Sequence, residues 1–322
     1  MNTDKTRLLI CVHLCSSVAI LSSAGCGRYA KFSLPAAAGG DTSLALRFVA
    51  SAEPVITRDE FRDVLNPSVA GRFNLYSVFD GQWHTALATT EDGGAHWQKQ
   101  GIVLRAPAGS YIAANGSALV HGGQVWYWYE TGTKDRLRIS LARSADARAW
   151  RPETAPVLDV GPSGAWDERA VADPYVIRVG DCFYMYYLGQ DRAVRQRIGL
   201  ARSLDGVRWE KLRTNPVVEM DEGERGIGEP AVWQSHGFYW MLYTVRDFSE
   251  GRHLRLARST DGVQWTKLAV RYRGEQGWDS KVICDPTVVV DGERILVWFG
   301  GGDAASPDEN LHGQIGFATL AK

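Results

Sequence analysis

The sequence has no excess of charge of either sign and no long basic run. Its 36 Lys and Arg residues are balanced by 37 Asp and Glu residues, for a formal net charge of -1 over 322 residues. A protein that binds nucleic acid or an anionic membrane surface electrostatically needs concentrated positive charge. The composition therefore predicts no nucleic-acid partner and no direct electrostatic contact with a membrane.

Cysteine is also scarce. Of the five cysteines, Cys11 and Cys15 lie in a predicted export signal and Cys26 lies at its end, which leaves Cys182 and Cys284. Two cysteines are too few to form a disulfide framework in a chain of this length. Both lie in apolar, strand-like runs, so we expect buried thiols and no catalytic cysteine.

The apolar run near the start, Leu8 to Leu21, is too short to span a bilayer. Basic residues precede it and SSAGC follows, which is typical of an export signal. Its end resembles a bacterial lipobox, which implies lipidation of Cys26; cleavage by ordinary signal peptidase is the alternative. We predict a signal at 1–25, a tether at 26–42, and a lipoprotein of the periplasm or cell surface, held to the membrane only through Cys26.

Helical periodicity is missing after residue 42, where short phrases recur instead. One phrase reads ALATTEDGGAHW (86–97), SLARSADARAW (140–150), GLARSLDGVRW (199–209) and RLARSTDGVQW (255–265), with GFATLAK ending the chain. A second phrase precedes each copy: NPSVAG at 66, NGSALV at 115, DPYVIR at 173, EPAVWQ at 229 and DPTVVV at 285. Equivalent alanines are spaced by 54 to 61 residues, so the chain contains five copies of one unit.

Each copy contains β-branched and aromatic runs separated by Gly and Asp turns, which is typical of four short antiparallel strands. Such units predict an all-β fold, a five-bladed β-propeller over residues 43–322. The last copy stops after its third strand, whereas LRFVASAEPVI (46–56) ends like the fourth strand of the other copies. We expect residues 44–56 to complete the fifth blade beside 314–320, which removes an exposed edge.

The S-x-D-G-x-x-W turn resembles the Asp box of sialidases. Its Asp is suited to accept backbone N–H groups and its Gly to adopt positive φ, so we interpret the motif as a structural turn. The many Trp and Tyr residues are interpreted as packing between blades rather than as sugar-stacking platforms.

The residues that begin the second phrase carry the functional signal. The innermost strands of a propeller line its channel, so these positions converge at one rim of the axis: Asn66, Asn115, Asp173, Glu229 and Asp285. Carboxylates in one pocket raise the pKa of at least one of them, and glycosidic cleavage requires a protonated acid beside an ionised one. The alternative is a strand-entry turn, which accounts for the repeated Pro but not for the single Glu.

The D-P steps, with GAWDERAVADPYVI, GWDSKVICDPTVV and IGLARSLDGVRW, resemble the five-bladed glycoside hydrolases of family 43 and the related families 32, 68, 117 and 130. The resemblance covers nearly all of residues 44–322 and implies an oligo- or polysaccharide substrate. By position it implies that Glu229 is the general acid and that Asp173 tunes its pKa. Asp285, the third carboxylate of the ring, is a further candidate catalytic residue. The expected substrate-binding residues are Asn66, Asn115, Asp63, Asp167 and Arg169.

Asn66 falls where family 43 has its general base, and an amide cannot accept a proton from water. Another carboxylate can be the base, with four candidates: Asp63, Asp285, Asp167 and Asp279. Alternatively, phosphate is the nucleophile, as in family 130 phosphorylases, or catalysis is lost and the domain only binds glycans. Because export argues against phosphorolysis, we rank a hydrolase first, a glycan-binding propeller second and a phosphorylase third.

The sequence predicts no cofactor and no metal site. His236, His253 and His312 lack paired ligand spacing. An axial calcium ion is compatible with such propellers, but no sequence feature supports one, and none indicates an oligomeric state.

Overall fold

The computed structural model describes residues 29–322, so the predicted signal at 1–25 and the predicted lipidation site Cys26 lie outside the described residues. The described chain is built from strands, with one short 3-10 helix, η1 (Gly277–Asp279). No helix in residues 29–322 is long and apolar enough to cross a membrane. The predicted all-β fold is confirmed.

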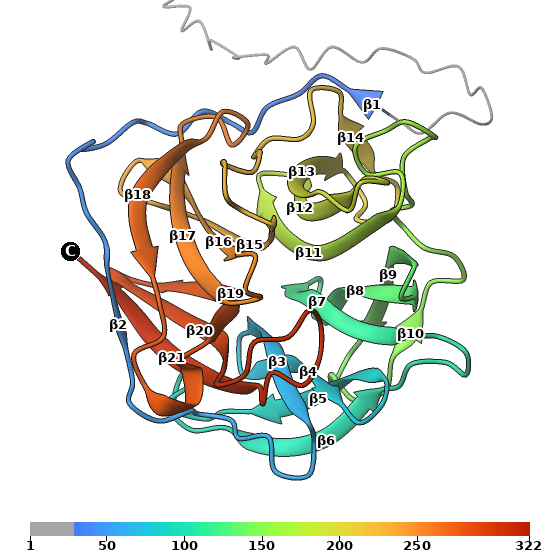
Figure 1. Cartoon of the computed structure of the whole chain (residues 1–322). Coiled ribbons are helices and arrows are strands. Elements are labelled where there is room, and N and C mark those ends of the chain that lie inside the picture. Colours follow the sequence, from blue (N-terminus) through green and yellow to red (C-terminus); the bar gives the residue numbers. More distant parts are fainter. Residues whose placement is uncertain (1–28) are drawn as a thin grey trace, which may run out of the picture.

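The strands form five successive units of four, arranged around a common centre (Figure 1). Unit one contains β3 (Asp63–Ala70), β4 (Phe73–Phe79), β5 (Trp83–Thr89) and β6 (Gln98–Leu104). Unit two contains β7 (Ile112–His121), β8 (Gln124–Thr133), β9 (Arg136–Ser144) and β10 (Arg151–Pro152). Unit three contains β11 (Ala170–Val179), β12 (Cys182–Gln190), β13 (Gln196–Ser203) and β14 (Glu210–Leu212). Unit four contains β15 (Gly226–Ser235), β16 (Phe238–Arg246), β17 (Arg252–Ser259) and β18 (Thr266–Tyr272). Unit five contains β19 (Val282–Asp291), β20 (Arg294–Gly302), β21 (Gln314–Ala321) and the N-terminal strand β2 (Arg47–Ala50).

Within every unit the neighbouring strands pair antiparallel, as predicted. The hydrogen bonding also continues between units, which the sequence did not indicate. Short parallel bridges join β5 to β7 and β17 to β19, so units one and two share a sheet, as do units four and five. These bridges lie at the ends of the innermost strands, next to the centre of the molecule.

The strand β2 completes unit five. It runs antiparallel to β21, with Arg47 opposite Ala321 and Ala50 opposite Ala318, and Ile56 forms a further bridge with Ile315. The predicted pairing of residues 44–56 with 314–320 is therefore confirmed. Because β2 covers the outer edge of β21, that edge is not left open to pair with another chain.

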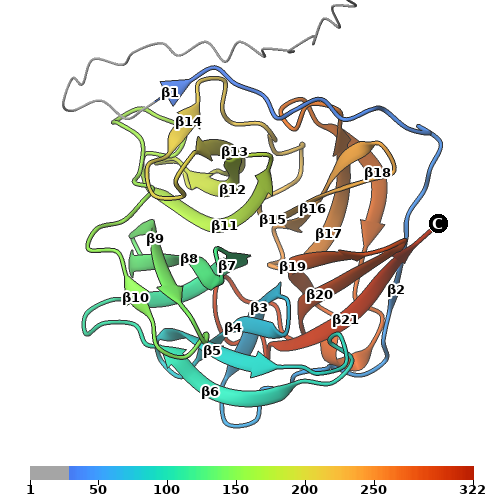
Figure 2. The same ribbon diagram turned by 180° about the vertical axis from the view of Figure 1, so that it is seen from behind.

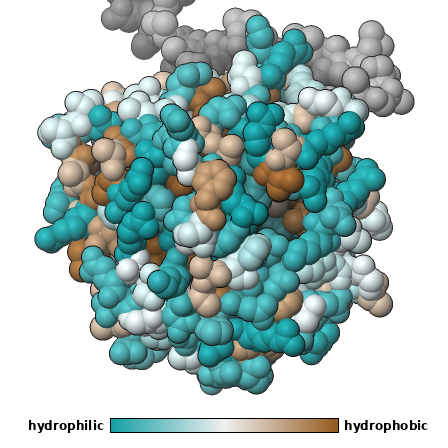
Figure 3. Space-filling view, viewed as in Figure 1, coloured by the Kyte–Doolittle hydropathy of each residue, from teal (hydrophilic) through white to brown (hydrophobic). Residues whose placement is uncertain are grey.

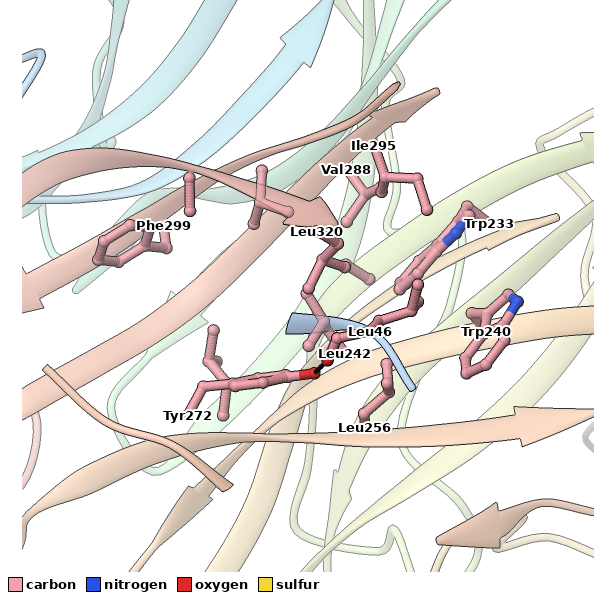
Figure 4. Packing of buried hydrophobic residues seen from close by; sticks show 14 of the residues in the cluster. Leu46, Trp233, Trp240, Leu242, Leu256, Tyr272, Val288, Ile295, Phe299 and Leu320 are labelled. Carbon is pink, nitrogen blue, oxygen red and sulfur yellow. Dashed lines mark hydrogen bonds between the residues drawn. The ribbon is translucent and has the colours of Figure 1, made fainter. Parts of the chain in front are cut away.

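The hydrophobic core lies between adjacent units rather than inside one of them. Figure 4 shows the cluster between units four and five, where Trp240, Leu242 and Leu256 face residues of β19, β20 and β21. The Tyr272 hydroxyl donates to the Leu46 carbonyl within this cluster. Equivalent clusters fill the other interfaces between neighbouring units. Aromatic burial of this kind supports the prediction that the Trp and Tyr residues pack between blades.

The S-x-D-G-x-x-W turns are structural, as predicted. The Asp205 carboxylate accepts from the N–H groups of Val207 and Arg208 at 3.0 and 2.8 Å, and Gly206 has φ +69°. The Trp209 indole donates to the Gly206 carbonyl at 3.0 Å. The Asp in this turn is therefore occupied by backbone groups.

Residues 29–42 do not form the free tether that the sequence predicted. The strand β1 (Tyr29–Ala30) pairs with β14, and Leu34 is buried against the turn of unit four, with its N–H donating to the Asp261 carbonyl. The Tyr239 hydroxyl donates to the Pro35 carbonyl at 2.7 Å. Figures 1 and 2 show this segment, which we call the strap, running along the outside of the molecule from β1 towards β2. The Ala and Gly composition suggested a linker, but Leu34 supplies an apolar anchor.

On the face seen in Figure 1, apolar side chains are scattered in small groups among polar ones (Figure 3). Groups of this size are ordinary on a protein surface. This face presents no broad apolar area.

Candidate functional site

One backbone feature recurs at the centre of every unit. The five residues predicted to ring the axis all have positive φ, between +45° and +51°, and each causes a register shift in the innermost strand: Asn66, Asn115, Asp173, Glu229 and Asp285. Positive φ is unfavourable for residues with a Cβ, but Asn and Asp tolerate it better than other residues. This tolerance explains why four of the five positions are Asn or Asp. Glu229 does not share it and therefore adopts a strained backbone conformation.

These bulges aim the five side chains into a cavity of about 340 Å³ at the axis, and all five line it. A second space of about 30 Å³, lined by the prolines that follow four of them, lies on the other side of the ring. The larger cavity is at the lower end of the roughly 300 to 1,000 Å³ that small-molecule sites occupy. The ring predicted from the sequence is therefore present, and Arg169 lies in the same cavity wall.

Carboxylates around the cavity form a chain in which each accepts from the backbone of the next unit. Glu130 accepts from the Asp173 N–H at 2.7 Å, the Asp173 carboxylate accepts from the Glu229 N–H, and Glu229 accepts from the Asp285 N–H at 3.0 Å. Side-chain hydrogen bonds also link Glu130 to Asp173 and Glu229 to Asp285. Two acid pairs therefore meet at the axis, one from units two and three and one from units four and five.

Burial and mutual repulsion raise the pKa of several of these acids. Burial, followed by the charge of Glu229, raises the pKa of Asp173 to about 7. The same two causes raise the pKa of Asp285 well above its usual value, while burial and the charge of Asp173 raise that of Glu130. The cavity thus holds protonated and ionised carboxyl groups side by side near neutral pH.

The main counter-charge beside the acids is Arg252, which is also buried. Burial opposes its charge, but Glu229 and Asp285 lie close enough to raise its pKa. Arg246, on the neighbouring strand, lines the same cavity. Arginine remains charged in such surroundings, so these two residues offset part of the negative charge of the acids.

Asp63 and Asp167, predicted as substrate-binding residues, do not line the cavity. Asp63 is fully buried and accepts from the N–H groups of Asn310, Leu311 and Gly313. Asp167 is also fully buried, and its carboxylate pairs with Lys211 at 2.6 Å. Both therefore lie in the body of the fold. Asp63 is occupied by backbone N–H groups and Asp167 Oδ2 by Lys211, whereas Asp167 Oδ1 is buried without a partner among the described residues.

Asp279, the fourth candidate base, lies at η1, where its carboxylate accepts from the Gln276 N–H at 2.8 Å. It does not line the cavity either. Of the four carboxylates considered as replacements for the base, only Asp285 lies in the cavity, with Oδ1 buried and without a partner.

Glu130 is the residue that sequence reasoning missed. It lies in β8 within WYWYETGT and is 2% exposed. Its counterparts at the same register in the other units are Ser77, Leu188, Thr244 and Gly300. A single acid in the middle of an aromatic strand was the available signal, because an unpaired acid is rarely buried.

Glu229, Cys284 and Asp285 offer three donor atoms within 4.8 Å of one another. A thiol must lose its proton to bind a metal ion, and burial, with the charge of Asp285, raises the pKa of Cys284 well above its usual value. Arg252 adds positive charge at the same place. This donor set is therefore poorly suited to a cation.

Comparisons with known proteins point to carbohydrate-active enzymes. The model for the glycosyl hydrolases family 32 N-terminal domain matches residues 73–214. The "Uncharacterized protein MT1551" of Mycobacterium tuberculosis is 34% identical over 224 residues, which cover 63% of this chain and 75% of that protein. Over residues 73–214 the chain is therefore similar to a family of glycosyl hydrolases, and it is related over most of its length to the mycobacterial protein.

Two further relatives match shorter parts of this glycoside hydrolase-like chain. The raffinose invertase of Escherichia coli is 30% identical over 38% of this chain and 27% of its own length. The 1,2-beta-oligomannan phosphorylase of Thermoanaerobacter is 27% identical over 36% of this chain and 42% of its own length.

Solved structures share the fold over most of the chain. A protein titled "Glycoside hydrolase" has a TM-score of 0.66 at 18% identity, over 90% of this chain and 93% of that one. The catalytic domain of a family 62 α-L-arabinofuranosidase from Coprinopsis cinerea has a TM-score of 0.65 at 12% identity, over 86% and 98% of the two chains. At these identities the likeness establishes the β-propeller fold.

Proposed function

We propose that this protein is an exported glycoside hydrolase that cleaves O-glycosidic bonds of oligo- or polysaccharides in the axial cavity. We also infer that the five units are the five blades of a propeller closed by β2. The observation that carries the proposal is the cluster of four acids, Glu130, Asp173, Glu229 and Asp285, in a cavity large enough for one or two sugar rings. Glycosidic cleavage needs a protonated and an ionised carboxyl group in one place.

Glu229 is proposed as the general acid that protonates the leaving oxygen. It is the only Glu in the ring, its conformation is strained, and it pairs with Asp285, whose raised pKa supplies a proton nearby. Strain at a single one of five equivalent positions is more easily explained by a function than by folding. Asp173 is proposed to tune this proton, since its carboxylate accepts from the Glu229 N–H.

The base requires a different solution from that of family 43. Donor atoms of Glu229 and Asp285 lie within 4.8 Å, whereas an acid and a water-activating base lie roughly 6.5 to 9.5 Å apart in inverting enzymes. Asp285 is thus too close to Glu229 to be that base. Asn66 cannot be the base either, because it is an amide. We therefore propose that the Glu130–Asp173 pair accepts the proton of the attacking water. When the two carboxyl groups share a single proton, one of them is free to accept another.

The test is a panel of aryl glycosides and natural oligosaccharides with the mature protein. Glu229→Gln keeps the shape of the side chain but removes its proton, so we expect hydrolysis of natural glycosides to fall by about a hundredfold or more. Substrates with good leaving groups need the proton less and should lose less. Glu293→Gln, at an exposed position in the β19–β20 turn, is the control and should leave the rate unchanged.

A non-catalytic glycan-binding propeller is the second candidate, because Asn66 lies in the cavity and three of the four acids accept backbone N–H groups of the bulges. This reading predicts no turnover in the panel, unchanged glycan affinity in Glu229→Gln, and no activity in Asn66→Asp. That combination of results would overturn the hydrolase proposal.

A phosphorylase is the third candidate, and two observations favour it. One relative carries that name, and five cationic side chains line the cavity: Lys134, Arg169, Arg225, Arg246 and Arg252. Sugar phosphate formed only when inorganic phosphate is added to the same panel would establish this activity in place of hydrolysis.

A further inference from the structure

The segment between β20 and β21, residues 303–313, forms part of the cavity wall through Pro307, Asp308 and Leu311. Unit four holds it from one side. Arg246 donates to the Pro307 carbonyl at 2.9 Å, and Arg252 donates to the same carbonyl at 2.6 Å. Both arginines come from strands that end at the cavity.

Unit two holds the same segment from the opposite side. Lys134 lies 3.1 Å from the Asp308 carboxylate and 3.2 Å from that of Glu309, and the Tyr111 hydroxyl donates to Glu309 at 2.9 Å. The Glu309 side chain is one-quarter exposed, so this attachment is partly shielded from solvent. We call residues 303–313 the crossing loop.

Unit one fixes the end of the crossing loop. Asp63 accepts from the N–H groups of Asn310, Leu311 and Gly313, as described above. Units two and four are not neighbours, because unit three separates them on one side and units five and one on the other. A loop from unit five that contacts both must therefore pass over the cavity, and Figure 1 shows it in red near the middle of the molecule, beside β7.

The cavity wall contributed by unit three has no such cover. Arg169, Gln190, Val194 and Gln196 line the cavity there, and Val194 is 41% exposed at the turn between β12 and β13. Arg225, just before β15, continues this wall and is half-exposed. The cavity is thus closed over units five, one and two and open towards unit three.

From this one-sided closure we propose that the enzyme removes single sugars from the non-reducing ends of glycan chains, with the rest of the chain leaving over unit three past Val194. The inference rests on the proposed hydrolase function. A chain bound through its middle would need an exit on both sides of the scissile bond, and the crossing loop blocks one of them. The anomeric carbon that is attacked belongs to the enclosed sugar, so the enclosed sugar is the non-reducing terminus.

The experiment uses an oligosaccharide of a sugar that the aryl-glycoside panel shows to be cleaved, tagged with a fluorophore at its reducing end. We expect the tagged product to shorten by one residue at a time. Tagged products of scattered length from the first minutes would overturn the inference, as would early release of a tagged monosaccharide. No cleavage of any substrate in the panel would instead contradict the proposed function.

A pair of variants tests the exit over unit three. Val194→Trp should lower kcat/KM for the oligosaccharide about tenfold or more through KM, and should lower kcat/KM for the small glycosyl fluoride of the same sugar much less, since fluoride does not reach that wall. Val290→Trp is the matched control, because Val290 is equally exposed, at 41%, but lies outside the cavity. Equal effects of the two variants on both substrates would contradict an exit at Val194.

The crossing loop is tested separately with the double variant Asp308→Ala/Glu309→Ala, which removes the side-chain contacts of the loop with Tyr111 and Lys134. We expect this variant to begin to release internal fragments that the wild-type protein does not form. A strictly stepwise pattern in a folded Asp308→Ala/Glu309→Ala protein would show that the loop does not impose end specificity.

Discussion

Asp173 couples the two acid pairs of the cavity. It is hydrogen-bonded to Glu130 on one side, accepts from the Glu229 backbone on the other, and lies near the positive charge of Arg252. Its pKa of about 7 places the loss of its proton near neutral pH. The protonation state of this one residue therefore sets the total charge beside Glu229.

We predict that kcat/KM rises as the pH rises through about 7. Because the pKa of Glu130 is also raised, loss of the Asp173 proton leaves the pair with one shared proton and one acceptor, which is the state that takes the water proton. The added negative charge also helps to keep the proposed acid Glu229 protonated. The measurement is a pH–rate profile on an activated aryl glycoside, compared with that of Asp173→Asn. The Asp173→Asn variant should be slower and should lack this rise. A wild-type rate that is the same at about pH 5 and at about pH 8 would contradict the assignment.

At the residue scale, comparison of the repeats identified functional residues at positions that occur in every copy, and it missed a residue that occurs in one copy. Asn66 and Glu229 were found because an equivalent position exists in each copy, and the shared bulge then fixes where their side chains point. Glu130 is unique to unit two, so no comparison between copies revealed it. Asp63 and Asp167 lie close in sequence to ring residues, but their hydrogen bonds point away from the cavity, and sequence distance carries no such direction.

At the scale of elements, the strap is the segment whose role depends most on a single residue. Leu34 is 2% exposed and is the fully buried residue of the strap in the cluster between units three and four, where Phe32 and Ala37 are only partly buried. The sequence predicted a linker because Ala and Gly dominate residues 35–40, and a lone Leu gives no periodic pattern. The turn at Gly262, against which the Leu34 side chain packs, lies far from Leu34 in the sequence.

We predict that Leu34→Ala lowers the free energy of unfolding by about 2 to 3 kcal/mol, the lower part of the range for buried leucines, because the strap lies at the edge of the core. Urea unfolding monitored by tryptophan fluorescence measures the change. Val49→Ala, at a 45% exposed position in β2, is the control and should cost less than about 0.5 kcal/mol. Equal destabilisation by the two substitutions would mean that Leu34 does not anchor the strap.

At the scale of the whole molecule, the order and pairing of the units followed from the period of the repeats. The completion of unit five by β2 was predictable because the last repeat has only three strands and the N-terminal strand belongs to no other repeat. The crossing loop was not, since its contacts with Lys134 and Arg252 join units that are distant in sequence. The parallel bridges between units depend in the same way on how closely the innermost strands approach one another.

Export remains a prediction that concerns residues before the described chain. Metabolic labelling with a fatty-acid analogue should tag the full-length protein in its native type of host and should be lost in Cys26→Ala. Cys182→Ala is the control and should keep the label. Label that persists in Cys26→Ala would refute lipidation at this residue, and export by ordinary signal cleavage would remain.

The docked strap changes what a lipid at Cys26 would do. Only residues 27 and 28 separate that cysteine from β1, so the anchor and the first strand of the folded body are joined by at most about 10 Å of extended chain. A linker of that length does not let the folded body move far from the membrane. A lipid at Cys26 would instead hold the outer edge of unit three next to the bilayer. The glycans that the cavity could bind would then be those close to the membrane.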